Sequence, residues 1–150
     1  MANDPREAIM ARLLIVIGQA SGVSNVSRNQ LYDDDAADTS KRVTLLEGDE
    51  IAAEEENLSR PAGVGRLIQM HPHVELSNFN TADRVGAGLS AARAAIIKAV
   101  AADATLISLT HKNTGGRYVG MESDLGFARE MLGRMTPKFQ FTYALIPSLL

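Results

Sequence analysis

The residues best suited to chemistry are two histidines, His71 and His73, separated by Pro72 in an alternating stretch. Side chains at i and i+2 of a strand lie on the same face, so both imidazoles could bind one metal ion. Such a site needs further ligands, and Glu75 and the distant His111 are the available candidates. No spacing in the sequence positions either of them. We therefore favour a polar strand face over a metal centre.

Acidic residues form two runs, one at 33–35 and the other at Glu54-Glu55-Glu56. The first run does not follow a calcium loop, because Ala37 and Asp38 stand where an oxygen ligand and a glycine are required. The second run is most simply a solvated loop. No pair of carboxylates has a spacing that indicates acid–base catalysis.

Motifs for nucleophilic catalysis and phosphate binding are absent from the sequence: there is no G-x-S-x-G, no P-loop and no G-x-G-x-x-G after a predicted strand. Phe139, Phe141 and Tyr143 alternate strictly with polar residues, which favours a buried stripe over a base-stacking platform. We therefore expect no catalytic residue, no bound metal and no cofactor, and we predict that the protein is not an enzyme.

The composition is that of an ordinary globular protein, with 45% hydrophobic and 22% charged residues among 150. A net charge of −3 argues against a role in gripping nucleic acid. The absence of cysteine excludes disulfides and thiolate metal sites, and it fits a reducing compartment. The apolar run at 13–17 is too short to span a bilayer and follows Asp4 and Glu7, so we expect no signal peptide and no membrane helix.

Two long helices are predicted. The first covers 4–20, because Asp4 is a good N-cap, Pro5 suits the first helical position and one apolar face follows. The second covers 81–102. Gly86 and Gly88 in its first turn each cost about 1 kcal/mol relative to alanine, so we expect that turn to pack closely on a neighbour. A short helical turn is expected after Asp103.

Five strands are predicted, at 23–28, 42–47, 64–79, 115–121 and 137–145. The strand at 64–79 has one apolar and one polar parity. Pro72 lies on the apolar parity, which indicates an edge strand or a bulge. The connection at 48–63 is acidic and long for a compact domain.

The predicted element order is therefore α-β-β-β-α-β-β, in a single α+β domain over residues 1–150. Two helices packed on one face of a five-stranded mixed sheet would cover the apolar face of every element. The other face of the sheet would stay polar unless a neighbouring subunit covers it.

In order and spacing these elements resemble the tail terminator family of long-tailed bacteriophages, the minor tail protein U type, which includes prophage tail-completion proteins. The matching segments cover nearly the whole chain. They are the helix R-E-A-I-M-A-R-L-L, the strand V-S-R-N, the acidic turn L-E-G-D-E at 46–50, the strand H-V-E-L, the helix at 83–100 and the strand F-Q-F-T-Y at 139–143. The sequence departs from the family where Ser40-Lys41-Arg42 replace an expected proline, and in the acidic connection at 48–63.

The resemblance implies a homo-oligomeric ring, a hexamer in this family, on the head-proximal end of the tail tube. The ring would end polymerisation of the tube protein and present a surface to head–tail connector proteins. The resemblance further implies a place in the virion tail, assembly in the host cytoplasm, contact with DNA only in passage, and no membrane. Two alternatives stay open: a head–tail connector of similar architecture, and a small metal-dependent enzyme using His71 and His73 with His111.

The acidic connection has two plausible destinations in such a ring. It could pair with basic residues of a neighbouring subunit, or it could line the central channel, where negative charge would keep passing DNA from sticking. The first version predicts an oligomer interface made of Glu54, Glu55, Glu56, Arg66, Arg84, Lys112 and Arg117.

Overall fold

The computed structural model describes residues 4–23, 26–29, 41–53, 63–77, 79, 87–124 and 133–150. Helix α1 spans Pro5–Ser21. The Asp4 carboxylate caps it by accepting a hydrogen bond from the Arg6 backbone N–H at 2.9 Å, and Gly22 ends it in the left-handed conformation with φ 68°. The helix predicted at 4–20 is therefore confirmed, with its capping residue and its glycine stop.

Two further helices follow one another along the chain. Helix α2 spans Ala87–Ala102, and α3 spans Ala104–Leu109 with Asp103 as its N-cap. A 3-10 turn, η1, follows at His111–Asn113. The described part of the helix predicted at 81–102 is confirmed, as is the turn after Asp103. Residues 81–86, including Arg84, lie outside the described residues.

Gly88 explains why the first turn of α2 contains a poor helix former. A Cβ at this position would lie 1.8 Å from the carbonyl oxygen of Phe79, so only glycine permits this approach of helix and chain. The close packing expected of this turn is confirmed at Gly88, whereas Gly86 lies outside the described residues.

The strands form one mixed sheet in the order β1-β2-β5-β7-β4-β3, with β6 paired to β7. Of the pairs formed by the described strands, β1 and β2 run parallel and the others are antiparallel. The strands are β1 Ser27–Arg28, β2 Arg42–Leu46, β3 Glu50–Ala52, β4 Arg66–Met70, β5 His73–Ser77, β6 Arg117–Asp124 and β7 Arg134–Leu145. A second 3-10 turn, η2, closes the described chain at Pro147–Leu149. The α+β class and the mixed sheet are confirmed.

The predicted five strands and their order are wrong, because the described residues form a sheet of seven strands, of which five precede α2. The strand predicted at 64–79 is interrupted at His71-Pro72, since proline has no N–H to donate. Its two parts, β4 and β5, lie end to end along β7 in one register, with Met70 opposite Phe141 and His73 opposite Lys138. Pro72 thus lies between two strands, β4 and β5, that are both in the interior of the sheet, and not in an edge strand. The missed strand β3 lies in the connection expected to be a loop, and it pairs with β4.

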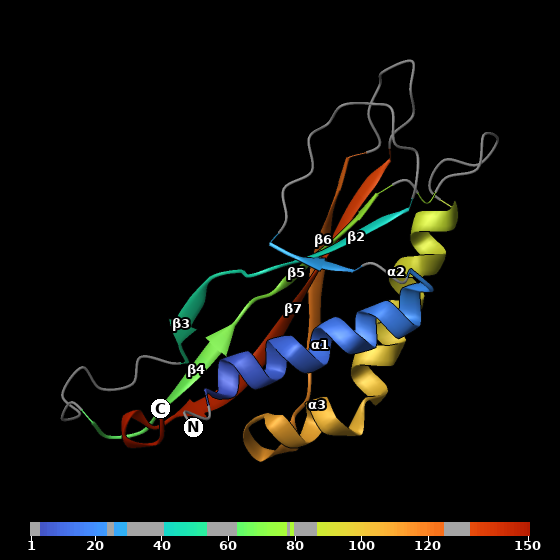
Figure 1. The fold of residues 1–150 in the computed structure, drawn as a ribbon. Coiled ribbons are helices and arrows are strands. Elements are labelled where there is room, and N and C mark those ends of the chain that lie inside the picture. Colours follow the sequence, from blue (N-terminus) through green and yellow to red (C-terminus); the bar gives the residue numbers. More distant parts are fainter. Residues whose placement is uncertain are drawn as a thin grey trace.

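The helices α1, α2 and α3 lie on one side of the sheet, as Figure 1 shows. The prediction of two helices on one face is thus confirmed, with α3 as a third. The strand residues that face the helices are buried, and Phe139, Phe141 and Tyr143 are at most 2% exposed. They belong to one core cluster with the apolar faces of α1 and α2, which confirms the aromatic core stripe. Within the described ranges, no helix has the length and apolarity needed to cross a membrane.

Candidate functional site

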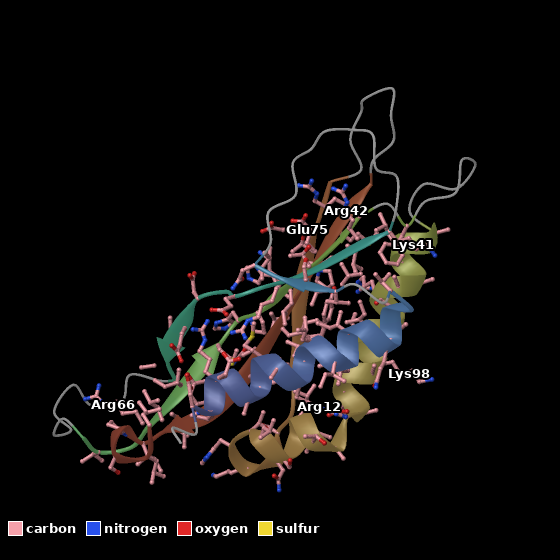
Figure 2. The ribbon with its side chains drawn as sticks, in the orientation of Figure 1. Arg12, Lys41, Arg42, Arg66, Glu75 and Lys98 are labelled. Carbon is pink, nitrogen blue, oxygen red and sulfur yellow. The ribbon has the colours of Figure 1, made fainter. Side chains whose placement is uncertain are left out.

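The strand residues that alternate with the core lie on the sheet face away from the helices, which we call the open face. Figure 2 shows Glu75 on this side and Arg12 on the helix side. No described helix covers the open face, as the polar parity of the sequence predicted. Its partly exposed members include Gln69, His73, Glu75, Ser77, Arg134, Thr136, Lys138, Gln140 and Thr142.

Ion pairs connect neighbouring strands on the open face. Arg134 Nε lies 3.5 Å from a carboxylate oxygen of Glu75, and Lys138 Nζ donates to Glu122 at 2.5 Å. The hydrogen bond from Lys138 lowers the pKa of the Glu122 carboxyl. Burial lowers the pKa of His73, and the positive charge of Lys138 lowers it further. The charges of Arg134 and Glu75, and of Lys138 and Glu122, are therefore paired with each other within the sheet.

The three histidines lie in two different places. His71 is in the break between β4 and β5, and His73 begins β5. His111 begins η1 and lines a pocket that includes neither of the other two. Among the described residues, no three histidine, aspartate or glutamate side chains come together as a metal site would require.

The pocket beside His111 lies at the start of β6. There Arg117 pairs with Gln140, and β7 extends further than β6, to Leu145. We call this pocket the edge pocket. Its volume is about 510 Å³, and its lining residues are Gln69, His111, 114–116, Arg117, Gln140 and Thr142. Gln69, Gln140 and Thr142 come from the open face of β4 and β7, and Arg117 lies opposite Gln140. The turn after α3 supplies His111 and 114–116, so sheet and turn build the pocket together.

The described residues that line the edge pocket include no acidic side chain. Arg117 carries a permanent positive charge, and no ion pair to it is present among the described residues. The two glutamine amides supply N–H donors beside it. A site with an ionised guanidinium, several neutral donors and no competing carboxylate suits a carboxylate or another small anion.

The predicted interface residues fall into separate parts of the molecule. Arg117 lines the edge pocket, and Lys112, which is exposed, directly follows the pocket residue His111. Arg66 lies opposite Leu145 at the far end of β4 (Figure 2), away from that pair. Arg84, Glu54, Glu55 and Glu56 lie outside the described residues. Arg117 and His111, the neighbour of Lys112 in the chain, therefore line one pocket, whereas Arg66 lies at another end of the sheet.

Sequence reasoning missed the neutral residues of the edge pocket. Gln69 belongs to β4, whereas Gln140 and Thr142 belong to β7, far away in the chain. Their polar parity predicted a solvent-facing strand face, which is correct, but only the strand register brings them together. Because uncharged residues in alternation are typical of any half-exposed strand, the sequence held no signal for the pocket itself.

Two of the segments that carried the family resemblance contact each other directly. Arg28 from V-S-R-N donates to Glu47 from L-E-G-D-E at 2.8 Å, and to Glu7 of α1 at 2.7 and 2.9 Å. The Asn29 side chain accepts the Glu47 backbone N–H at 3.0 Å. Hydrogen bonds from Arg28 lower the pKa of both carboxyls. These polar residues therefore tie α1, β1 and the end of β2 together, which explains their occurrence without a catalytic role.

No protein-family model matches the chain, and no curated protein matches it. Among solved structures, a chain of a native gene transfer agent virion aligns with 18% identity and a TM-score of 0.49, covering 96% of this chain and 100% of that one. The sheath/tube terminator of an extracellular contractile injection system, in its extended state, aligns with 10% identity and a TM-score of 0.51, covering 97% of this chain and 57% of that one. The resemblance to tail terminators seen in the sequence therefore holds at the level of the fold.

Proposed function

We propose that the chain is a structural tail-tube terminator of a phage or a phage-like particle. The observation that carries this proposal is the fold shared with a sheath/tube terminator over 97% of the chain. The segments that resemble phage tail terminators support it independently, because they cover nearly the whole sequence. In this role the chain binds the head-proximal end of the tail tube and stops further addition of tube protein.

We propose further that the working form is a closed ring of identical subunits, a hexamer by the family resemblance. Strand β3 is the last strand on one side of the sheet, and its three residues are exposed. Strand β6, on the other side, pairs only with β7 among the described strands. Two different free edges on one sheet favour head-to-tail contacts, which close into rings when the rotation permits.

The proposed partners are the tail tube protein on one side of the ring and head–tail connector proteins on the other. DNA would contact the ring only in passage through its channel. The protein would assemble in the host cytoplasm and remain in the virion tail. We propose no reaction and no cofactor, in keeping with charges on the open face that pair with each other, Glu75 with Arg134 and Glu122 with Lys138.

A polymerisation assay tests the terminator role. Tube protein of the same particle is allowed to polymerise with increasing amounts of this chain, and tube lengths are measured by negative-stain microscopy. We expect mean tube length to fall as the ratio of chain to tube protein rises. Tubes that keep the same length distribution at every ratio would rule the role out, and a chain that binds only purified connectors would favour a joining protein instead.

A further inference from the structure

We infer that the edge pocket is a carboxylate-binding site that receives the acidic segment at 49–56 of a second copy of this chain. The inference deepens the proposed function, because it rests on a ring of identical subunits and locates the contact between neighbours.

The chemistry of the pocket selects an anion. Among the described residues that line it, Arg117 alone carries a permanent charge, and none is acidic. Lys112 adds a second exposed cation next to His111. The volume of about 510 Å³ is ample for one or two acidic side chains and the backbone that carries them. An isolated guanidinium at a protein surface gains most from a bidentate carboxylate partner.

The acidic segment begins at β3, on the sheet edge opposite the one that carries the edge pocket. The two lie in the same cross-strand row of residues. Ile51 of β3 lies opposite Gln69, and Gln69 lies opposite Thr142 of the pocket. Asp49 and Glu50 are exposed at the start of β3, and the sequence continues after Ala53 with Glu54, Glu55 and Glu56. One end of these strand rows therefore carries acids and the other end carries the cationic pocket.

This arrangement suits a head-to-tail contact between copies. When identical sheets follow one another side by side, the β3 edge of each copy meets the edge of the next copy that carries the edge pocket. Each edge also has large exposed apolar side chains, Ile51 at 52% on β3 and Val119 at 46% and Met121 at 39% on β6, which such a contact would remove from water. The contact is heterologous, so every copy uses both of its edges in a ring.

A phosphate of DNA is the other anion that could reach a ring of this kind. The open face disfavours it, because Glu75 and Glu122 alternate there with Arg134 and Lys138 rather than leaving a basic stripe. A single cationic pocket fits a short acidic peptide segment better than a duplex backbone. DNA binding is therefore treated as an opposing outcome of the test.

The first experiment measures self-association by sedimentation velocity, for the chain alone and for the chain on tail tubes. Arg117→Glu is expected to weaken self-association at least about tenfold, because it places like charges together. Lys98→Glu makes the same change of charge on the exposed side of α2 (Figure 2) and is expected to leave association unchanged. Self-association of Arg117→Glu equal to that of the wild-type chain would overturn the inference, as would a wild-type chain that is monomeric both alone and on tubes.

A charge swap tests the identity of the occupant. Arg117→Glu combined with Glu54→Lys, Glu55→Lys and Glu56→Lys is expected to restore association that either set of changes alone removes. Failure of the swap to restore it would contradict the assignment of the acidic segment. If Arg117→Glu does not fold, Gln140→Glu replaces it, since an acid directly opposite Arg117 would neutralise the guanidinium and should also weaken association.

The same variants separate this inference from the terminator role. Normal self-association of Arg117→Glu, in a chain whose wild type stops tube growth, overturns the pocket inference alone. Pocket-dependent association in a chain that never limits tube length overturns the terminator role alone. Loss of binding to a duplex DNA probe by Arg117→Glu, with self-association unchanged, would reassign the pocket to phosphate and overturn the inference.

Discussion

At the scale of single residues, Asp103 links two helices with one carboxylate. Its Oδ1 accepts the Leu106 backbone N–H at 2.8 Å, which caps α3. Its two oxygens also accept Nε and a terminal nitrogen of Arg12 from α1, at 3.1 and 2.6 Å. The hydrogen bond from Arg12 lowers the pKa of Asp103, so the carboxyl stays ionised at neutral pH. The cap and the ion pair can be separated by mutation.

Asp103→Ala removes both contacts and is expected to lower the free energy of unfolding by about 1 kcal/mol for the cap, with a further loss from the ion pair. Asp103→Asn keeps a good capping side chain and loses only the ion pair, so its cost should be smaller. Urea unfolding at neutral pH measures both variants. Equal losses for the two substitutions would show that the cap contributes nothing.

His73 is expected to make stability depend on pH. Its folded-state pKa lies below the unfolded value of about 6.5, because burial and Lys138 disfavour the charged form. Below pH 6.5 the unfolded chain therefore takes up the proton first, and the free energy of unfolding falls as the pH drops towards the folded-state pKa. Above pH 6.5 the contribution of His73 is fully present.

His73→Gln is expected to flatten the fall in stability below about pH 6.5, measured by urea unfolding at several pH values. Lys138→Gln should flatten it in part, since it removes one of the causes that lower the His73 pKa, the positive charge of Lys138. A pH profile of His73→Gln that runs parallel to the wild-type profile throughout this range would contradict the assignment.

At the scale of elements, the acidic turn L-E-G-D-E is fixed by a close backbone contact. A Cβ on Gly48 would lie 1.6 Å from the carbonyl oxygen of His71, in the break between β4 and β5. The His71 N–H donates to the Asp49 carbonyl at 3.0 Å across the same contact. Glycine at 48 therefore lets the chain pass from β2 to β3 against the interrupted strand.

Gly48→Ala is expected to lower the free energy of unfolding by about 3 kcal/mol or more, because backbone atoms must move to admit the methyl group. Gly18→Ala is the matched control, since its new methyl would meet its nearest neighbours at 3.6 and 3.8 Å. This control should raise stability by up to about 1 kcal/mol through helix propensity. Thermal or urea unfolding measures the free energy of unfolding of both variants. A Gly48→Ala chain as stable as the wild type would refute the close contact.

The elements predicted well from the sequence are those with local signals. Asp4, Pro5 and Gly22 mark both ends of α1, and the strict alternation in β7 identifies its buried aromatic face. Strand β3 has no such signal, because it is three residues long and exposed throughout, and its pairing with β4 is a contact between segments. The edge pocket escaped prediction for the same reason, since register alone brings Gln140 to Arg117. The resemblance to a family supplied the function hypothesis that no single residue could.

At the scale of the whole molecule, the chain has one sheet face covered by its own helices and one face that none of the described helices covers (Figure 1). Its two sheet edges differ, with acids at β3 and the edge pocket beside β6 and β7. An asymmetric pair of edges is what a subunit needs in order to bind a copy of itself on each side. The chain shares its fold with a sheath/tube terminator over 97% of its length.

Cryo-electron microscopy of tail tubes, assembled in the presence of this chain, tests the terminator role in a single experiment. A terminator is expected to appear as one ring at one end of each tube, with its subunits fitted by this fold and with the β3 edge of each subunit facing the edge pocket of the next. Tubes without added density, or with the chain at both ends or along their length, would contradict the role.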